Sequence, residues 1–213
     1  MKAITLKSLS LICSSLALLL APRVASAYYV PVNQNVPDGN PVGLASSLVI
    51  NNLPDGTTVA GVTVGLNLTG GYNGDLYGYL VAPNGVSVNL LNRPGVTDLN
   101  PFGAGGSGLN VTLADSAAQS VQTAPETAGA VLSGSYQAAV ALTGLNGAAA
   151  NGTWRLFLED QSLGGGQAVL NGWSVSFSPV PEPALTMVLT SLVLASVTVG
   201  VQFHRRRQAR ICA

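Results

Sequence analysis

The sequence predicts an all-β domain, a β-sandwich of two antiparallel sheets, with an apolar segment at each end of the chain. Short stretches alternate between apolar and polar residues with a period of two, which is typical of half-buried strands. Many of the chain's 25 glycines fall between those stretches, and no stretch between the apolar ends has the spacing of an amphipathic helix. Many short strands with glycine-rich turns predict two packed sheets.

Residues 1–27 have the features of a secretory signal peptide. Lys2 and Lys7 precede an apolar stretch, and Ala25-Ser26-Ala27 forms a small-residue cleavage site before Tyr28. We therefore expect the secretion translocon to export the chain and signal peptidase to remove this leader. Both cysteines lie outside the exported domain, which is expected to lack a disulfide and to be held together by its core.

Charged residues are scarce and unevenly placed. Between the leader and the C-terminal tail, Arg93 and Arg155 are the only basic residues, against nine acidic ones, a net charge of −7. Without a basic patch, nucleic acid is not expected as a partner. His204 lies in the tail and both lysines lie in the leader, so neither Ser-His-Asp nor Ser-Lys catalysis is expected outside the membrane.

The sandwich is expected over residues 43–178, after a Pro- and Asn-rich lead-in segment over 28–42. Within 59–68, alternate residues from Ala60 to Leu68 are apolar and predict one buried face. The expected strands are 47–50, 59–68, 76–82, 86–91, 109–113, a short one around Val140 and Leu142, 153–158 and 170–177.

Two features of these strands predict how they pack. Pro83-Asn84-Gly85 is a turn signal, so residues 76–91 are expected to form a hairpin. Trp154 and Trp173 fall on the apolar faces of the last two strands, and both are expected to lie in the core.

Several motifs of this region resemble the P domain, or Homo B domain, of proprotein convertases. They are Asn73-Gly74-Asp75-Leu76, Ala82-Pro83-Asn84-Gly85, Asn151-Gly152-Thr153-Trp154-Arg155-Leu156 and Leu170-Asn171-Gly172-Trp173-Ser174-Val175. The resemblance covers roughly Gly43 to Phe177. It implies a jelly-roll-like β-sandwich, a domain that in convertases stabilises a subtilisin-type catalytic domain and has no catalytic triad of its own.

Residues 179–213 combine three elements in a fixed order: Val180-Pro181-Glu182-Pro183, an uncharged run over 184–203, and Arg205-Arg206-Arg207. Twenty helical residues span roughly 30 Å, enough for one transmembrane helix, and the arginines mark its cytoplasmic side as a stop signal.

The three elements closely resemble the PEP-CTERM sorting signal of Gram-negative bacteria. The resemblance implies that Val180, Pro181, Glu182 and Pro183 are recognised by an exosortase, a membrane protease that cleaves near the motif. The chain would be held in the inner membrane transiently and then reach the cell surface or extracellular matrix.

Three acidic residues at strand–loop junctions are candidate metal ligands: Asp75, Asp115 and Asp160. Carboxylates suit Ca²⁺, the candidate cofactor, and the resemblance implies the same ion because some bacterial P domains bind Ca²⁺ through acidic residues at these junctions. The alternative is that these residues cap loops in solvent. The chain has Gly164-Gly165-Gly166 where family members often carry another acid, which favours that alternative.

We expect a non-enzymatic structural or adhesive protein of an exopolysaccharide or biofilm matrix. Exopolysaccharide is a candidate partner because tyrosine rings stack on sugars; the candidate rings are Tyr28, Tyr29, Tyr72, Tyr77 and Tyr79. One alternative is a non-catalytic accessory domain of a separate subtilisin-like serine protease. The other is a hydrolase that uses Asp75, Asp115 and Glu159.

Overall fold

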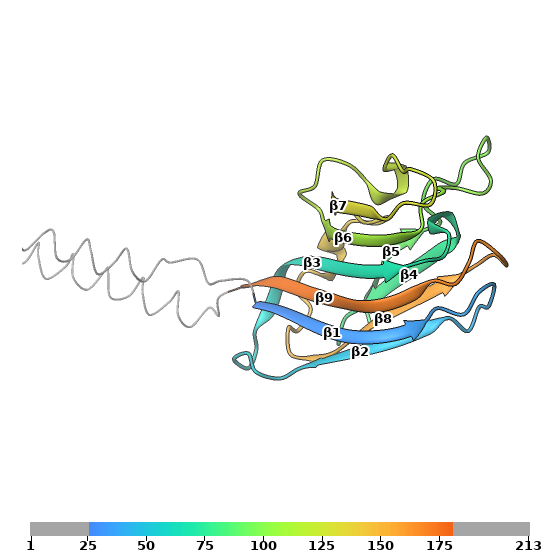
Figure 1. Cartoon of the computed structure of the whole chain (residues 1–213). Coiled ribbons are helices and arrows are strands. Elements are labelled where there is room, and N and C mark those ends of the chain that lie inside the picture. The colour runs from blue at the N-terminus through green and yellow to red at the C-terminus, as the bar shows by residue number, and fades with distance from the viewer. Residues whose placement is uncertain (1–25, 181–213) are drawn as a thin grey trace, which may run out of the picture.

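A computed structural model describes residues 26–180 as two β-sheets packed face to face (Figure 1). The predicted leader up to residue 25, the motif residues Pro181–Pro183, the apolar run and the arginine tail lie outside the described residues. The strands are β1 (Ser26–Asn35), β2 (Leu44–Ile50), β3 (Thr58–Thr69), β4 (Leu76–Val81), β5 (Ser87–Asn92), β6 (Gly108–Ala114), β7 (Leu132–Tyr136), β8 (Gly152–Asp160) and β9 (Val169–Val180). Three short 3₁₀ helices connect them: η1 (Asn73–Asp75), η2 (Val121–Thr123) and η3 (Leu142–Leu145).

Sheet A has the strand order β1-β9-β3-β6-β7, and sheet B has the order β2-β8-β4-β5. The all-β sandwich of two sheets predicted from the sequence is confirmed. One pair departs from the antiparallel arrangement, because β6 and β7 run parallel. The long connection over residues 115–131 returns the chain to the starting end of β6, as a parallel pair requires.

The core consists of the inward faces of both sheets and contains both tryptophans, as predicted. Trp154 and Trp173 are buried, and the Trp154 ring stacks on Phe177 with centroids 5.9 Å apart. Each indole N–H has an acceptor: the Ala150 carbonyl at 3.1 Å for Trp154 and the Ser46 hydroxyl at 2.9 Å for Trp173. The predicted hairpin is also present, as the antiparallel pair β4–β5.

The predicted alternation of β3 is correct from Val62 onward and wrong at its start. Val62, Val64, Leu66 and Leu68 are buried, but Ala60 is exposed and Val59 is buried instead. The pairing of β3 with β9 shifts register between Val59 and Gly61, and such a bulge reverses the faces on its two sides.

The lead-in predicted over residues 28–42 is wrong, because the sandwich begins with β1, which pairs along β9. Pro31 is tolerated because β1 lies at the edge of sheet A, where one row of backbone groups needs no partner. The Tyr28 ring stacks on Phe177 at 5.8 Å, and Val36 is fully buried.

Two further predictions in the middle of the chain are wrong. The strand expected around Val140 and Leu142 is instead the 3₁₀ helix η3, which buries Leu142 and Leu145. The expected strands also omit residues 132–136, which form β7 and add Leu132 to the core.

The two ends of the sandwich are called the proximal pole and the distal pole. At the proximal pole, Ser26 pairs with Phe177 and Thr58 with Val180, so β1 begins beside the end of β9 (Figure 1). The distal pole, roughly 35 Å away along β3, holds the loops after β1, β3 and β8. Within residues 26–180, no helix is long and apolar enough to cross a membrane.

Replacing Trp154 with alanine is expected to lower the free energy of unfolding by about 3–5 kcal/mol, because a large buried side chain leaves a cavity. Urea denaturation followed by circular dichroism measures the change. Phe102→Ala is the matched control, since Phe102 is 73% exposed and its loss should change stability by less than about 0.5 kcal/mol. Equal losses in both variants would contradict this account of the core.

Candidate metal centre

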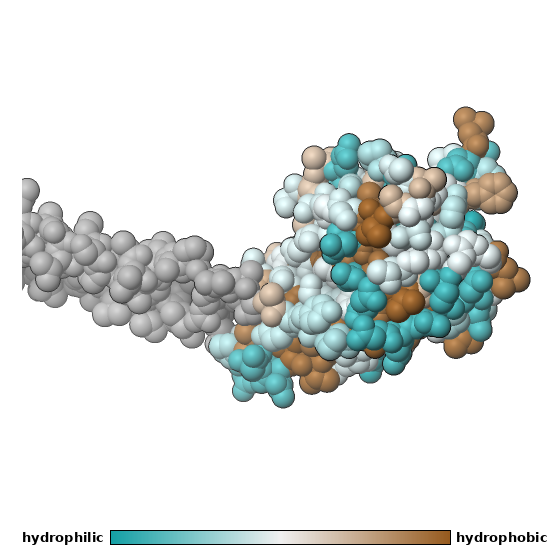
Figure 2. Space-filling view, viewed as in Figure 1, coloured by the Kyte–Doolittle hydropathy of each residue, from teal (hydrophilic) through white to brown (hydrophobic). Residues whose placement is uncertain are grey.

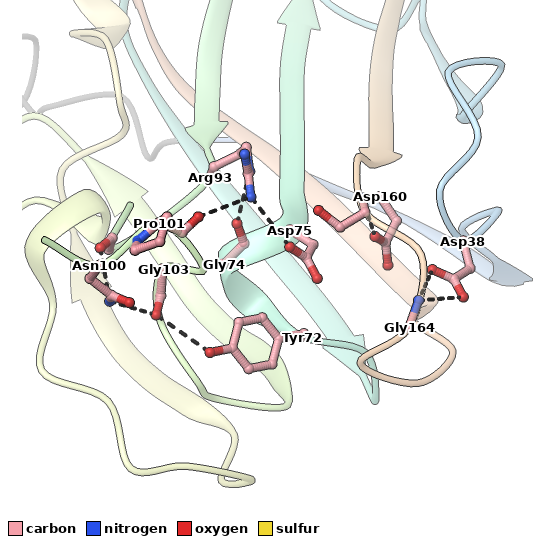
Figure 3. A network of polar contacts seen from close by, with 12 residues as sticks. Asp38, Tyr72, Gly74, Asp75, Arg93, Asn100, Pro101, Gly103, Asp160 and Gly164 are labelled. Carbon is pink, nitrogen blue, oxygen red and sulfur yellow. Dashed lines mark hydrogen bonds and ion pairs between the residues drawn. The ribbon is translucent and has the colours of Figure 1, made fainter. Parts of the chain in front are cut away.

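Three carboxylates gather at the distal pole from separate parts of the chain (Figure 3). Asp160 ends β8, Asp75 ends η1 directly before β4, and Asp38 lies in the loop between β1 and β2. Because Leu76 of β4 pairs with Asp160 of β8, the pairing of these two strands places Asp75 next to Asp160.

Asp160 is the most unusual of the three. Its side chain is 0% exposed, its Oδ1 accepts a long hydrogen bond of 3.4 Å from the Ser162 N–H, and its buried Oδ2 has no hydrogen-bond partner. Burial raises the pKa of Asp160 from 3.8 to about 6. The Ser162 N–H opposes this shift, and the nearby charges of Asp38 and Asp75 add to it.

Asp75 is 7% exposed and has one positively charged neighbour. Its Oδ1 lies 3.6 Å from Nη2 of Arg93, whose Nε donates to the Gly74 carbonyl at 3.2 Å. The same Nη2 reaches the Pro101 carbonyl at 3.5 Å, so Arg93 links η1 to the loop after β5. The cluster of three acids thus includes one arginine, which pairs with Asp75.

The glycine-rich loop after β8 closes over the acids. Both oxygens of Asp38 accept from the Gly164 N–H at 3.2 Å. Gly165 has φ +77°, and a Cβ on it would lie 2.6 Å from the Cβ of Tyr72 and 3.5 Å from Oδ2 of Asp75. Glycine is required here for both backbone angle and space.

The cluster of Asp38, Asp75 and Asp160 meets some of the requirements of a site for a hard cation such as Ca²⁺. An unpartnered, buried carboxylate oxygen beside other acids is costly unless it is protonated or bound to a cation. As the side chains stand, no group of three or more His, Cys, Asp or Glu residues within 26–180 is placed to hold a metal ion. A Ca²⁺ ion bound at Asp75 and Asp160 would need further oxygen ligands from backbone carbonyls or water. The calcium site therefore stays a prediction.

Asp115, the third predicted ligand, lies elsewhere. It follows β6, which runs from Gly108 beside Thr69 to Ala114 beside Thr63, so Asp115 is roughly 20 Å from the distal pole. Its Oδ1 accepts from the Leu142 N–H at 2.7 Å and its Oδ2 from the Thr143 N–H at 2.8 Å. It therefore orients η3.

Sequence reasoning missed Asp38 and Arg93 as members of this cluster. Asp38 precedes a glycine in a turn, which is a common loop signal, and only the strand pairing brings it to Gly164. Glu159, considered with Asp75 and Asp115 for hydrolysis, precedes buried Asp160 and therefore faces the outer side of sheet B. These three acids are not gathered at one place.

Of the sorting signal, the described residues include only the first motif residue. Pro181, Glu182 and Pro183 of the sorting motif and Arg205–Arg207 of the stop signal lie outside the described residues. Val180, the first motif residue, is the last residue of β9 and pairs with Thr58.

Two solved structures resemble the sandwich. The crystal structure of a serine protease of Aeromonas sobria matches with a TM-score of 0.47 and 18% identity, over 74% of this chain and 27% of that chain. The same protease in complex with its chaperone matches with a TM-score of 0.45 and 19% identity, over 80% and 29%. This chain thus spans less than a third of the protease. No protein-family model and no curated protein matches the sequence.

Calcium is expected to raise the thermal unfolding midpoint of the wild-type chain, because binding only to the folded state stabilises it. The measurement is a melting curve at about pH 7 in EDTA and in millimolar calcium. Asp160→Asn should abolish the calcium shift. Asp115→Asn, the control, should melt earlier in both buffers but keep the shift. An unchanged unfolding midpoint of the wild type at millimolar calcium would contradict the predicted calcium site.

In EDTA, stability is expected to fall as pH rises from about 4 to about 6. Asp160 has its pKa raised from 3.8 to about 6 in the folded state, so the folded chain binds more protons than the unfolded chain within that window. Asp160→Asn lacks this group, and its stability advantage over the wild type should therefore grow from pH 4 to pH 7. Urea denaturation across this range measures it; a constant difference would refute the assignment.

Proposed function

We propose that this chain is an exported, non-catalytic protein of the cell surface or exopolysaccharide matrix, released from the inner membrane by an exosortase-type protease. The sandwich is its functional part, with a P-domain-like, jelly-roll-like character suggested by the motifs around Asp75 and Trp173. The translocon, signal peptidase and exosortase are its processing partners.

One observation supports this proposal above the others. The buried core runs from Val36 to Phe177, inside both predicted cleavage points. The leader cut before Tyr28 and the motif that begins at Val180 fall on strand ends at the proximal pole. Both cuts would leave the core intact and release a folded module.

The composition of the sandwich supports a non-catalytic role. Residues 28–179 contain no His, Lys or Cys, so a nucleophile there has no nitrogen base to activate it. The cluster of acids around Asp160 links three loops and suits structural cation binding.

Substituting alanine for Pro181, Glu182 and Pro183 is expected to block processing and to retain a full-length form in the inner membrane. The two prolines hold the chain extended, which suits a protease substrate, and alanine removes that restriction. Immunoblots of membrane and extracellular fractions measure size and location. The control is Phe102→Ala with Leu163→Ala, two exposed distal residues, which should be released normally. Unchanged release of the motif variant would contradict the proposal.

A further inference from the structure

The outer face of sheet A is hollowed along its middle strand. Two hollows of about 240 Å³ each lie end to end over β3, one around Gly65 and Asn67 and the other around Gly61 and Thr63. We call them together the sheet A trough. Its floor rises little above the backbone because glycines 61 and 65 have no side chains.

Small uncharged polar side chains line the trough in regular rows. Strand register places Ser174 and Thr112 on either side of Gly65, and Ser176 beside Thr63. Gly172 and Asn110 flank Asn67 in the same way. Figure 2, seen from the side of sheet A, shows pale surface together with teal and brown patches over these strands. The lining therefore offers hydroxyl and amide groups, both donors and acceptors.

One charged residue borders the trough. Asp115 lies at its proximal end, with one oxygen accepting from Leu142 N–H and the other from Thr143 N–H. Both of its carboxylate oxygens are thus already hydrogen-bonded. A charged ligand would find no counter-ion along this floor, whereas a neutral ligand rich in hydroxyl groups would find hydrogen-bond partners.

An aromatic ring lies over the trough at its other end. Tyr29 of β1 pairs with Ser174, and its ring leans over Gly172, where the hydroxyl and Cζ stand against the backbone. Any Cβ at Gly172 would collide with this ring. Tyr29 is 62% exposed, so much of the ring remains open to solvent.

The aromatic rings on sheet B make an informative contrast. Tyr79 stacks on Phe157 with centroids 4.9 Å apart, and Tyr77 packs edge-on against Tyr79. Their faces are used within the protein. Among the stacked or edge-on ring pairs of residues 26–180, none includes Tyr29.

We infer that the sheet A trough binds an extended, neutral polysaccharide, with one sugar ring stacked on Tyr29 and the chain running along β3 toward Gly61. An aromatic face contacts the C–H side of a sugar, and the flanking amides and hydroxyls bind its hydroxyl groups. The trough from Asn67 to Gly61 is roughly 20 Å long, which suits an extended β-1,4-linked glycan. The excess of acids in the sandwich disfavours polyanionic glycans. This inference rests on the proposed matrix function and names its ligand class.

The test is isothermal titration calorimetry of the purified full chain with soluble β-1,4-linked glucomannan, galactomannan and xyloglucan, and with alginate as an acidic comparison. At least one neutral glycan should bind, and alginate should not. Tyr29→Ala should weaken binding about tenfold, as expected for loss of one aromatic contact. Phe102→Ala, which removes an exposed ring at the distal pole, should leave the Kd unchanged.

Gly61→Val is the second variant, because it fills the trough without disturbing the fold. No atom lies within 4 Å of a Cβ placed on Gly61, and valine favours strands. The melting temperature should hold or rise while glycan binding weakens. The Gly61→Val variant also tests the trough without changing Tyr29, which lies close to the predicted leader cleavage site.

Three outcomes of the titrations would overturn the inference: no binding of any neutral glycan, unchanged binding in Tyr29→Ala or Gly61→Val, or equal affinity for alginate. Capture of a protein partner that these variants abolish, without glycan binding, would also overturn it. Binding is measured on purified protein and does not depend on export. The two proposals can therefore fail separately. Absent glycan binding with normal motif processing would contradict only the glycan site, and glycan binding with failed motif processing would contradict only the proposed export route.

Discussion

The antiparallel pairing of β3 with β9 from Thr58 to Thr69 is the interaction on which the rest of the molecule depends. It joins an early strand to the last one, so that β1 can pair on the far side of β9 and β6 on the far side of β3. It also turns Trp173 and Phe177 inward, where Phe177 meets Trp154 of the other sheet. Because the sandwich has no cysteine, this long-range pairing and the core it closes replace a covalent link.

The same pairing sets the two outer features of sheet A. Since side chains alternate along a strand, burying Val64 and Leu66 forces Gly65 and Asn67 onto the solvent face. Ser174 and Gly172 of β9 then stand beside them. The trough is a direct result of the register that fills the core, and a slip of one residue would exchange the two faces.

Sequence alone predicted what depends on local alternation. The inward faces of β3 beyond its bulge, the hairpin β4–β5 and both buried tryptophans follow from patterns within a few residues. It failed where a partner strand decides the outcome. Pro31 looked like a loop residue, yet the edge position of β1 accommodates it.

The candidate sites show the same limit. An acid at the end of a strand is visible in the sequence, so Asp75 and Asp160 were found. Asp160 is also close to the charge of Asp38, which is far away in the chain and which the Gly164 N–H binds. Likewise, the contact of Tyr29 with Gly172 requires the β1–β9 register, which no local pattern reveals.

The geometry also separates the two sites in space. The acids tie together the loops at the distal pole, whereas Tyr29 is held over the outer face of sheet A by its pairing with Ser174 and by the stacking of neighbouring Tyr28 on Phe177. The bulge between Pro31 and Gln34 interrupts the ladder between them. A change at the distal carboxylates therefore has no continuous ladder along β1 by which to displace the Tyr29 ring. Sites that share neither contacts nor a common shifting element behave additively, so cation binding should stiffen the loops without altering the trough.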